Sequence, residues 1–256
     1  MEVNLAIKKT VEYARGFRAS LNKAEISERL ISRKIFSKRE INNEIKKVKD
    51  KNKTNVWYVE KFSKAKILAQ RIEKKFDDIL FLGISGSVAS GHPKKNDDID
   101  FLVIVKNDRL WKTRVFLRWW MWKKQIPHRK YGGQGKKDEF CFNLWLDESG
   151  LLLPKDKHSL RSAIDLVLLK PLINKNQFYE KFILENDWAK KWVATPYSIK
   201  SKKIRYKMLD TKIKQNNFDK FINYVYFWPQ YWYMRRKIKD EKVGLHKAFF
   251  HRRMVE

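Results

Sequence analysis

A glycine–serine pair and two closely spaced aspartates are the residues of this sequence best suited to chemistry. Gly86 and Ser87 end one apolar run, and Asp98-Ile99-Asp100 opens the next after a gap of ten residues. Because side chains alternate along a strand, Asp98 and Asp100 are expected on one face, with Ile99 pointing into the core. Paired carboxylates suit Mg²⁺, which prefers oxygen ligands and also binds phosphate oxygens. The spacing therefore predicts a metal site beside a turn that can approach a ligand closely.

Phosphate binding is the chemistry that the neighbouring residues could add to this metal site. Gly86 lets the backbone approach a ligand, and Ser87 with the following N–H groups can hold the phosphates of a nucleotide. Lys94 and Lys95 could neutralise a triphosphate, and Arg109 could reach an NTP. In so basic a chain, a solvated surface is an equally good explanation of these three cations.

Three apolar runs are expected to form the strands that position these residues. The runs at 79–85 and 100–105 are continuous, and the run at 140–147 alternates between apolar and other residues. Helical periodicity runs through 61–78 and again through 109–125, where the apolar face is rich in Trp and Phe. This order predicts an α/β (α+β) protein with a small mixed sheet and packed helices.

Helical segments flank this central region on both sides. Ser37 and Glu40 have the spacing of a capping box, which marks a helix start within the N-terminal segment. The β-favouring run Val56–Val59 after a polar stretch is compatible with a small wing, so the segment could be a winged helix, a packing domain or a dimerisation domain. The predicted parts are a helical module, with or without a wing, at 1–60, a linker helix at 61–78, the central domain at 79–150 and a helical basic region at 151–256.

These motifs resemble the nucleotidyltransferase superfamily of the DNA polymerase β type. The resemblance covers residues 79–147 and combines a Gly-Ser dipeptide, a spacing, an Asp-hydrophobic-Asp motif and strand context. It implies that Asp98 and Asp100 bind two Mg²⁺ ions and that Gly86 with Ser87 cradles the triphosphate of an NTP. More loosely, the chain is similar to uncharacterised bacterial and archaeal nucleotidyltransferase-domain proteins, which bring no known substrate.

The third carboxylate that this superfamily supplies from a later strand has no clear counterpart. Alternation along 140–147 places Cys141, Asn143, Trp145 and Asp147 on one face. Asn143 has the expected mid-strand position but lacks charge and basicity, whereas Asp147 has the chemistry but lies about 13 Å further along the strand. Both residues therefore remain candidates for the catalytic position.

The charge of the chain favours polyanionic partners. Its 58 Lys and Arg residues exceed its 29 Asp and Glu residues by 29. The segment Lys200–Arg253 is the most basic part, with 16 Lys and Arg against 4 Asp and Glu, and aromatic residues are interleaved among the cations. Bases stacking on rings and phosphates meeting cations would suit single-stranded nucleic acid, while a helical core with a basic outer face is the competing explanation.

Several other classes of protein are excluded or disfavoured. The single cysteine, Cys141, cannot form an internal disulfide or a Cys-based zinc site, which favours a reducing compartment. The sequence contains no P-loop, no Gly-x-Gly-x-x-Gly, no Gly-x-Ser-x-Gly and no His-Glu-x-x-His. It also shows neither the apolar core of a signal peptide nor a membrane span, so we expect a cytoplasmic location.

The resemblance implies a Mg²⁺-dependent enzyme that transfers an NMP from an NTP to a hydroxyl and releases pyrophosphate. RNA is favoured over DNA as the acceptor on charge alone. Two alternatives stay open: a small-molecule or protein acceptor, and a nucleic-acid-binding regulator whose nucleotidyltransferase fold has lost catalysis. The identity of the NTP and the oligomeric state cannot be read from the sequence.

Overall fold

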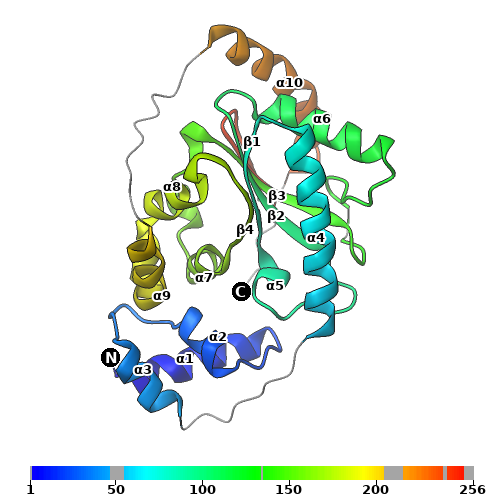
Figure 1. The fold of residues 1–256 in the computed structure, drawn as a ribbon. Helices are drawn as coiled ribbons and strands as arrows, with labels where there is room; N and C mark the ends of the chain where they lie inside the picture. The colour runs from blue at the N-terminus through cyan, green and yellow to red at the C-terminus, as the bar shows by residue number, and fades with distance from the viewer. Residues whose placement is uncertain (1, 47–54, 134, 205–215, 239–240, 251–256) are drawn as a thin grey trace. The chain divides into compact units, whose positions relative to one another are not determined.

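The chain forms two compact units. The computed structural model describes residues 2–46, 55–133, 135–204, 216–238 and 241–250 (Figure 1). The first unit comprises Met1–Asn55, Leu152–Leu169 and Glu180–Met208. The second unit comprises Val56–Leu151, Lys170–Tyr179 and Leu209–Glu256. The region after residue 151 thus contributes to both.

A six-stranded mixed sheet forms the centre of the second unit. Its strand order is β4-β1-β2-β3-β6-β5. β2 pairs in parallel with β3, whereas the other pairs are antiparallel. The strands are β1 (Ile79–Ile84), β2 (Ile99–Val105), β3 (Phe140–Asp147), β4 (Lys170–Asn174), β5 (Lys242–Val243) and β6 (Lys247–Phe249). The predicted α/β (α+β) class and the three predicted strands are confirmed.

Helices bury one face of this sheet. The helices of the second unit are α4 (Val56–Lys75), α5 (Gly86–Ala89), α6 (Leu110–Lys123) and α10 (Asn217–Arg235). Leu68 and Ile72 of α4 and Leu117 of α6 share one core cluster with Leu82 of β1 and Val103 of β2. All five side chains are at most 3% exposed. This burial turns Ile99, Phe101 and Val103 of β2 toward the helices, so Asp100 between them points to the opposite face of the sheet.

The run Val56–Val59, expected as a possible wing, is instead the first turn of α4. The reason is periodicity, because apolar residues continue at helical spacing through Ala65 to Ile72 and are buried against the sheet. Tertiary packing of that face outweighs the local β preference of Val, Trp and Tyr. Residues 47–54, which would hold the rest of the wing, lie outside the described residues.

The first unit is built of helices. They are α1 (Val3–Gly16), α2 (Lys23–Glu28), α3 (Lys38–Ile45), α7 (Leu160–Leu168) and α9 (Lys190–Lys203), while α8 (Phe178–Glu185) begins in the second unit. Short 3-10 helices cover Glu148–Gly150, Lys155–Lys157, Lys175–Gln177 and Asp187–Ala189. The predicted capping box is confirmed, since Ser37 Oγ accepts from Glu40 N while the Glu40 carboxylate accepts from Ser37 N.

Candidate active site

Asp98 and Asp100 lie at the start of β2, on the face of the strand that points away from the core cluster of the second unit. Asp98 immediately precedes the strand, and the carbonyl of Asp100 accepts from Ser85 N (2.9 Å), which ties the end of β1 to it. One oxygen of each carboxylate and the Sγ of Cys141 lie within 4.8 Å of one another. The two aspartates therefore lie beside each other, as the alternation along a strand predicts.

Two glycines make room for these carboxylates. Gly86 has φ +64°, and a Cβ there would lie 2.6 Å from Asp100 Oδ2. A Cβ at Gly135 would lie 2.8 Å from Asp98 Oδ2. Both distances are shorter than any real Cβ contact, so a side chain at either position would displace a carboxylate. Gly86 and Ser87 form the turn that begins α5, directly beside Asp100, whereas the role of Gly135 is not visible in the sequence.

Substituting Gly135 should disturb the carboxylates without affecting the fold. We expect Gly135→Ala to weaken Mn²⁺ binding by about tenfold or more, because the new methyl group must push Asp98 aside. Isothermal titration calorimetry with Mn²⁺ measures this. Gly16→Ala is the matched control, since a Cβ there meets nothing within 4 Å. Equal affinities of the two variants would contradict the assignment.

Asn143 of β3 contacts the aspartate pair directly. Its Nδ2 donates to Asp100 Oδ1, and its Oδ1 accepts from Cys141 Sγ (2.8 Å). Burial raises the pKa of the Cys141 thiol, so this thiol stays protonated and can act as the donor. Asn143 is 3% exposed. It therefore occupies the place beside Asp100 where a third carboxylate was expected.

A bulge in β3 separates Asn143 from Asp147. The pairing Phe101↔Phe142 is followed by Leu102↔Leu144, so Asn143 is the extra residue and the alternation shifts after it. The expectation that Cys141, Asn143, Trp145 and Asp147 share one face is wrong for this reason. Trp145 pairs with Val103 and lies in the core cluster, on the opposite face.

Asp147 is also at the other end of the strand. It pairs with Val105, five residues beyond Asp100, which corresponds to about 16 Å at ~3.3 Å per residue. The structure thus brings Asn143 to the aspartate pair and leaves Asp147 apart from it.

Arg129 completes the group around Asp98. Its Nη1 lies 3.2 Å from Asp98 Oδ2 and 3.7 Å from Cys141 Sγ, while its Nε donates to Gly133 O (3.0 Å). Arg129 N donates to Phe140 O, so the segment before it runs along the edge of β3. No local pattern pointed to Arg129, since it lies 31 residues from Asp98. The two residues meet because the Arg129 segment pairs with β3, which itself pairs with β2.

The sequence model of one protein family, described as nucleotidyltransferase domain, matches residues 65–222. This match covers more than half of the chain and includes all of the residues around Asp98 and Asp100. The chain belongs to the nucleotidyltransferase-domain family. No curated protein and no solved structure matches it. Family membership supports nucleotidyl transfer as the general activity and an NTP as the substrate.

Lys61 is a buried cation near this site that the sequence did not single out. Its Nζ donates to the carbonyls of Asp97 (2.7 Å) and Lys95 (3.2 Å) and to Asp138 Oδ1 (2.6 Å). The side chain is 1% exposed, and three acceptors match its three donors. Lys61 therefore joins the loop before Asp98 to the loop that follows Gly135.

The other cations predicted to bind the nucleotide lie in the loop before Asp98 and at the far end of β2. Lys94 and Lys95 are exposed in the loop that leads to Asp98, and Lys95 Nζ lies 5.7 Å from the centroid of the Trp57 ring. Arg109 is engaged elsewhere, because it bonds to Asp78 (3.0 Å) and Asp219 (2.7 Å). These ion pairs fix the start of α6, at the end of β2 opposite to the aspartates.

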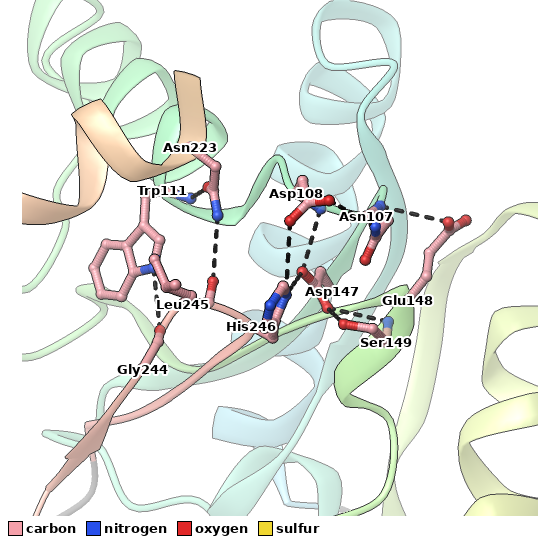
Figure 2. A network of polar contacts seen from close by, with 10 residues as sticks. All are labelled: Asn107, Asp108, Trp111, Asp147, Glu148, Ser149, Asn223, Gly244, Leu245 and His246. Atoms are coloured by element: carbon pink, nitrogen blue, oxygen red, sulfur yellow. Dashed lines mark hydrogen bonds and ion pairs between the residues drawn. The ribbon is translucent and has the colours of Figure 1, made fainter. Parts of the chain in front are cut away.

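Asp147 belongs to a second polar cluster at that opposite end (Figure 2). Its Oδ1 accepts from Ser149 N (3.1 Å) and Ser149 Oγ (2.7 Å). Its Oδ2 accepts from Asp108 N (3.3 Å) and from the Nδ1–H of His246 (2.7 Å). A carboxylate has about four acceptor directions, and here all are occupied. Although ligand atoms of Asp108, Asp147 and His246 lie close enough to hold a metal, this bonding gives Asp147 a structural role that ties the β5–β6 hairpin to β3.

The His246–Asp147 bond should make the anchoring of the hairpin depend on pH. The hydrogen bond that His246 donates to the Asp147 carboxylate raises the pKa of His246 above 6.5, so the stabilisation is fully present below about pH 6.5 and is lost as pH rises through the folded pKa. We expect His246→Gln to speed hydrogen exchange in β6 strongly at about pH 6 and weakly at about pH 9, relative to the native chain. A difference that grows with pH would contradict this sign.

The residues around Asp98 and Asp100 fit a hard divalent cation. Two carboxylates offer oxygen ligands, and the glycines leave the space beside them free of side chains. Arg129 contributes one positive charge, so the side chains of Asp98, Asp100 and Arg129 together carry a net charge of −1.

Within the described residues, no helix is long and apolar enough to cross a membrane.

Proposed function

We propose that this chain transfers a nucleoside monophosphate from an NTP to a hydroxyl group and releases pyrophosphate. The observation that carries the proposal is the Asp98–Asp100 pair beside the Gly86-Ser87 turn, inside a region that matches the nucleotidyltransferase domain. This arrangement offers a place for a cation next to a place for phosphates, which phosphoryl-group chemistry requires.

Asp98 and Asp100 would hold the Mg²⁺, two ions according to the family resemblance. When bound, Mg²⁺ supplies positive charge that stabilises the attacking hydroxyl oxygen and the leaving pyrophosphate. Gly86 and Ser87 would hold the triphosphate, with Lys94 and Lys95 close enough in sequence to neutralise it. Asn143 would orient Asp100 through its hydrogen bond, while Arg129 orients Asp98.

We assign the acceptor hydroxyl to RNA. The net charge of +29 produces a field that concentrates polyanions at the surface of the protein. RNA ends carry free hydroxyl groups next to a polyanionic backbone, so the charge favours them over uncharged small molecules.

A second candidate function is nucleic-acid binding without catalysis. Two contacts favour it: the amide of Asn143 stands beside Asp100 where a third carboxylate was expected, and Arg129 already pairs with Asp98. An amide cannot accept the proton of an attacking hydroxyl as a carboxylate can. In this case the chain would bind NTP or RNA but would not catalyse nucleotidyl transfer.

Incubation with each labelled NTP, Mg²⁺ and total RNA tests both functions. We expect label to appear in RNA with one or more NTPs and to depend on Mg²⁺. Label in a small molecule or in protein would overturn the RNA assignment alone. Binding of an NTP without transfer to any acceptor would replace the first function with the second.

A further inference from the structure

Helix α10 is apolar on two opposite faces. Its inner face contributes Asn223, Phe227 and Met234 to the interior of the second unit, and Asn223 Oδ1 accepts from Trp111 N (2.8 Å). Its outer face carries a line of exposed rings, which we call the aromatic stripe: Phe218, Phe221, Tyr224, Trp228 and Trp232. They recur every three or four residues and are between 39% and 67% exposed. Large apolar side chains exposed side by side in this way are typical of interaction sites.

Cations accompany the exposed rings. Arg235 lies over the Trp232 ring (5.6 Å to its centroid), and Lys237 lies over the Tyr233 ring (4.9 Å). Trp119 of the neighbouring helix α6 is 52% exposed and has Lys123 over its ring (5.2 Å). Rings paired with cations are suited to ligands that combine flat bases with negative charge.

Acidic side chains are nearly absent from these two helices. The sequence of α6 contains no Asp or Glu, and α10 contains only Asp219, which is bound to Arg109 (2.7 Å). An exposed surface without free carboxylates favours an anionic partner. The same charge opposes association with a second copy of this chain, which would bring two surfaces of like charge together.

Arg118 of α6 adds an independent sign of a missing anion. Its guanidinium is partly buried near Tyr233 and Cys141, and burial lowers its pKa. Among the described residues it makes no hydrogen bond or ion pair, and its neighbour Arg114 has Gln230 but no carboxylate as a partner. A cation that loses water without gaining an acceptor is costly unless a ligand supplies one. A phosphate is an anion of the right charge and geometry for a guanidinium.

The stripe leads toward the aspartate pair. Lys237, just after α10, lies so close to Gly132 that a Cβ there would be 3.1 Å from the lysine Cδ. Gly132 is three residues beyond Arg129, which contacts Asp98. A chain lying along α10 would therefore reach the loop that borders the candidate active site.

We propose that the outer face of α10, with Arg235 and Lys237, binds single-stranded nucleic acid, and that Arg118 meets a phosphate where the strand passes toward the candidate active site. Unpaired bases stack on the aromatic stripe and phosphates meet the cations, whereas the stacked bases of a duplex cannot reach the rings. That the bound strand is the acceptor rests on the proposed function, but binding itself does not. Of the cations expected in this region, Arg205, Lys207, Lys212, Lys214, Lys239, Arg252 and Arg253 lie outside the described residues.

Fluorescence anisotropy with labelled single-stranded RNA, single-stranded DNA and duplex tests this surface on the full chain. We expect both single strands to bind more tightly than duplex. Trp228→Ala with Trp232→Ala should weaken single-strand binding by about tenfold or more, since each stacked base contributes roughly a factor of 5 to 150. Phe17→Ala is the matched control, because this ring is 52% exposed in the first unit and has Arg161 over it (6.0 Å).

The contribution of Arg235 and Lys237 is measured separately, through the salt dependence of binding. Arg235→Gln with Lys237→Gln should flatten the plot of log affinity against log salt by about 1.4, at roughly 0.7 for each phosphate that is no longer neutralised. Unchanged affinity in the tryptophan variant, or equal binding of duplex, would overturn the proposal. So would a dimer, detected by light scattering, that dissociates in that variant, or binding to anionic lipid vesicles in place of nucleic acid.

The variant Asp100→Asn separates this inference from the proposed function. It should bind single strands as the native chain does and should fail to transfer label. If the native chain and Asp100→Asn both bind single strands but neither transfers label, the proposed function alone would be contradicted. If the variant with Trp228→Ala and Trp232→Ala transfers label to RNA at the native rate and binds RNA with the native affinity, the aromatic stripe alone would be contradicted.

Discussion

Replacing Asp100 by Asn should reduce nucleotidyl transfer by at least about a hundredfold while leaving the fold intact. One oxygen of the Asp100 carboxylate lies within 4.8 Å of one of Asp98, close enough for both to bind the same cation, so its loss would remove one of the two charged ligands. A metal ion contributes several kcal/mol of charge stabilisation in a transition state, and each 1.4 kcal/mol corresponds to about a factor of ten. The rate of label transfer from the active NTP measures the effect, and Mn²⁺ affinity should fall with it.

Asp187→Asn is the matched control for this change. The Asp187 side chain is 67% exposed in the first unit, where it pairs with the exposed Lys190 (3.1 Å). It should show the turnover and Mn²⁺ affinity of the native chain. Turnover of Asp100→Asn within about twofold of the control would show that the metal assignment is wrong, because no other group could compensate for a lost ligand so fully.

Replacing Asn143 by Asp should accelerate transfer, by about tenfold or more. Asn143 lies beside Asp100 on the bulge of β3, so a carboxylate there would stand where the superfamily supplies its third one. A positioned general base contributes roughly a factor of 10² to 10⁴. Single-turnover rates with saturating NTP measure this step.

The same variant has a readout that does not depend on turnover. Without metal, three carboxylates share the site with Arg129, and their repulsion should lower the melting temperature; Mn²⁺ should restore it. Asn143→Ala serves as the comparison, since it loses the bond to Asp100 but adds no charge. Slower transfer and no Mn²⁺-dependent recovery in Asn143→Asp would mean that Asn143 itself is the functional residue.

Local patterns were sufficient for the main elements of the second unit. Continuous apolar runs predicted β1 and β2, and the Asp98-Ile99-Asp100 alternation placed two carboxylates together, because side chains on a strand alternate whatever surrounds it. The Ser37–Glu40 capping box of the first unit was likewise readable, since its bonds join residues three positions apart. Patterns of this range require no knowledge of distant partners.

Other elements depended on partners that are distant in sequence. Lys170–Asn174 lies in the region that was expected to be helical but forms β4, because it pairs with β1 some ninety residues earlier. The short strands β5 and β6 were not predicted, and they exist through pairing with each other and with the edge of β3. Strand formation at a sheet edge is decided by the edge that is available, which a local window does not contain.

The site shows the same division. The sequence by itself determined the Asp98–Asp100 pair, the Gly86-Ser87 turn beside it and the candidacy of Asn143. Only the tertiary structure decided between Asn143 and Asp147, because one bulge residue shifts the alternation of every side chain that follows it. It also brought Arg129 to the aspartates from another segment, since a salt bridge depends on distance in space and leaves no periodic signal in the chain.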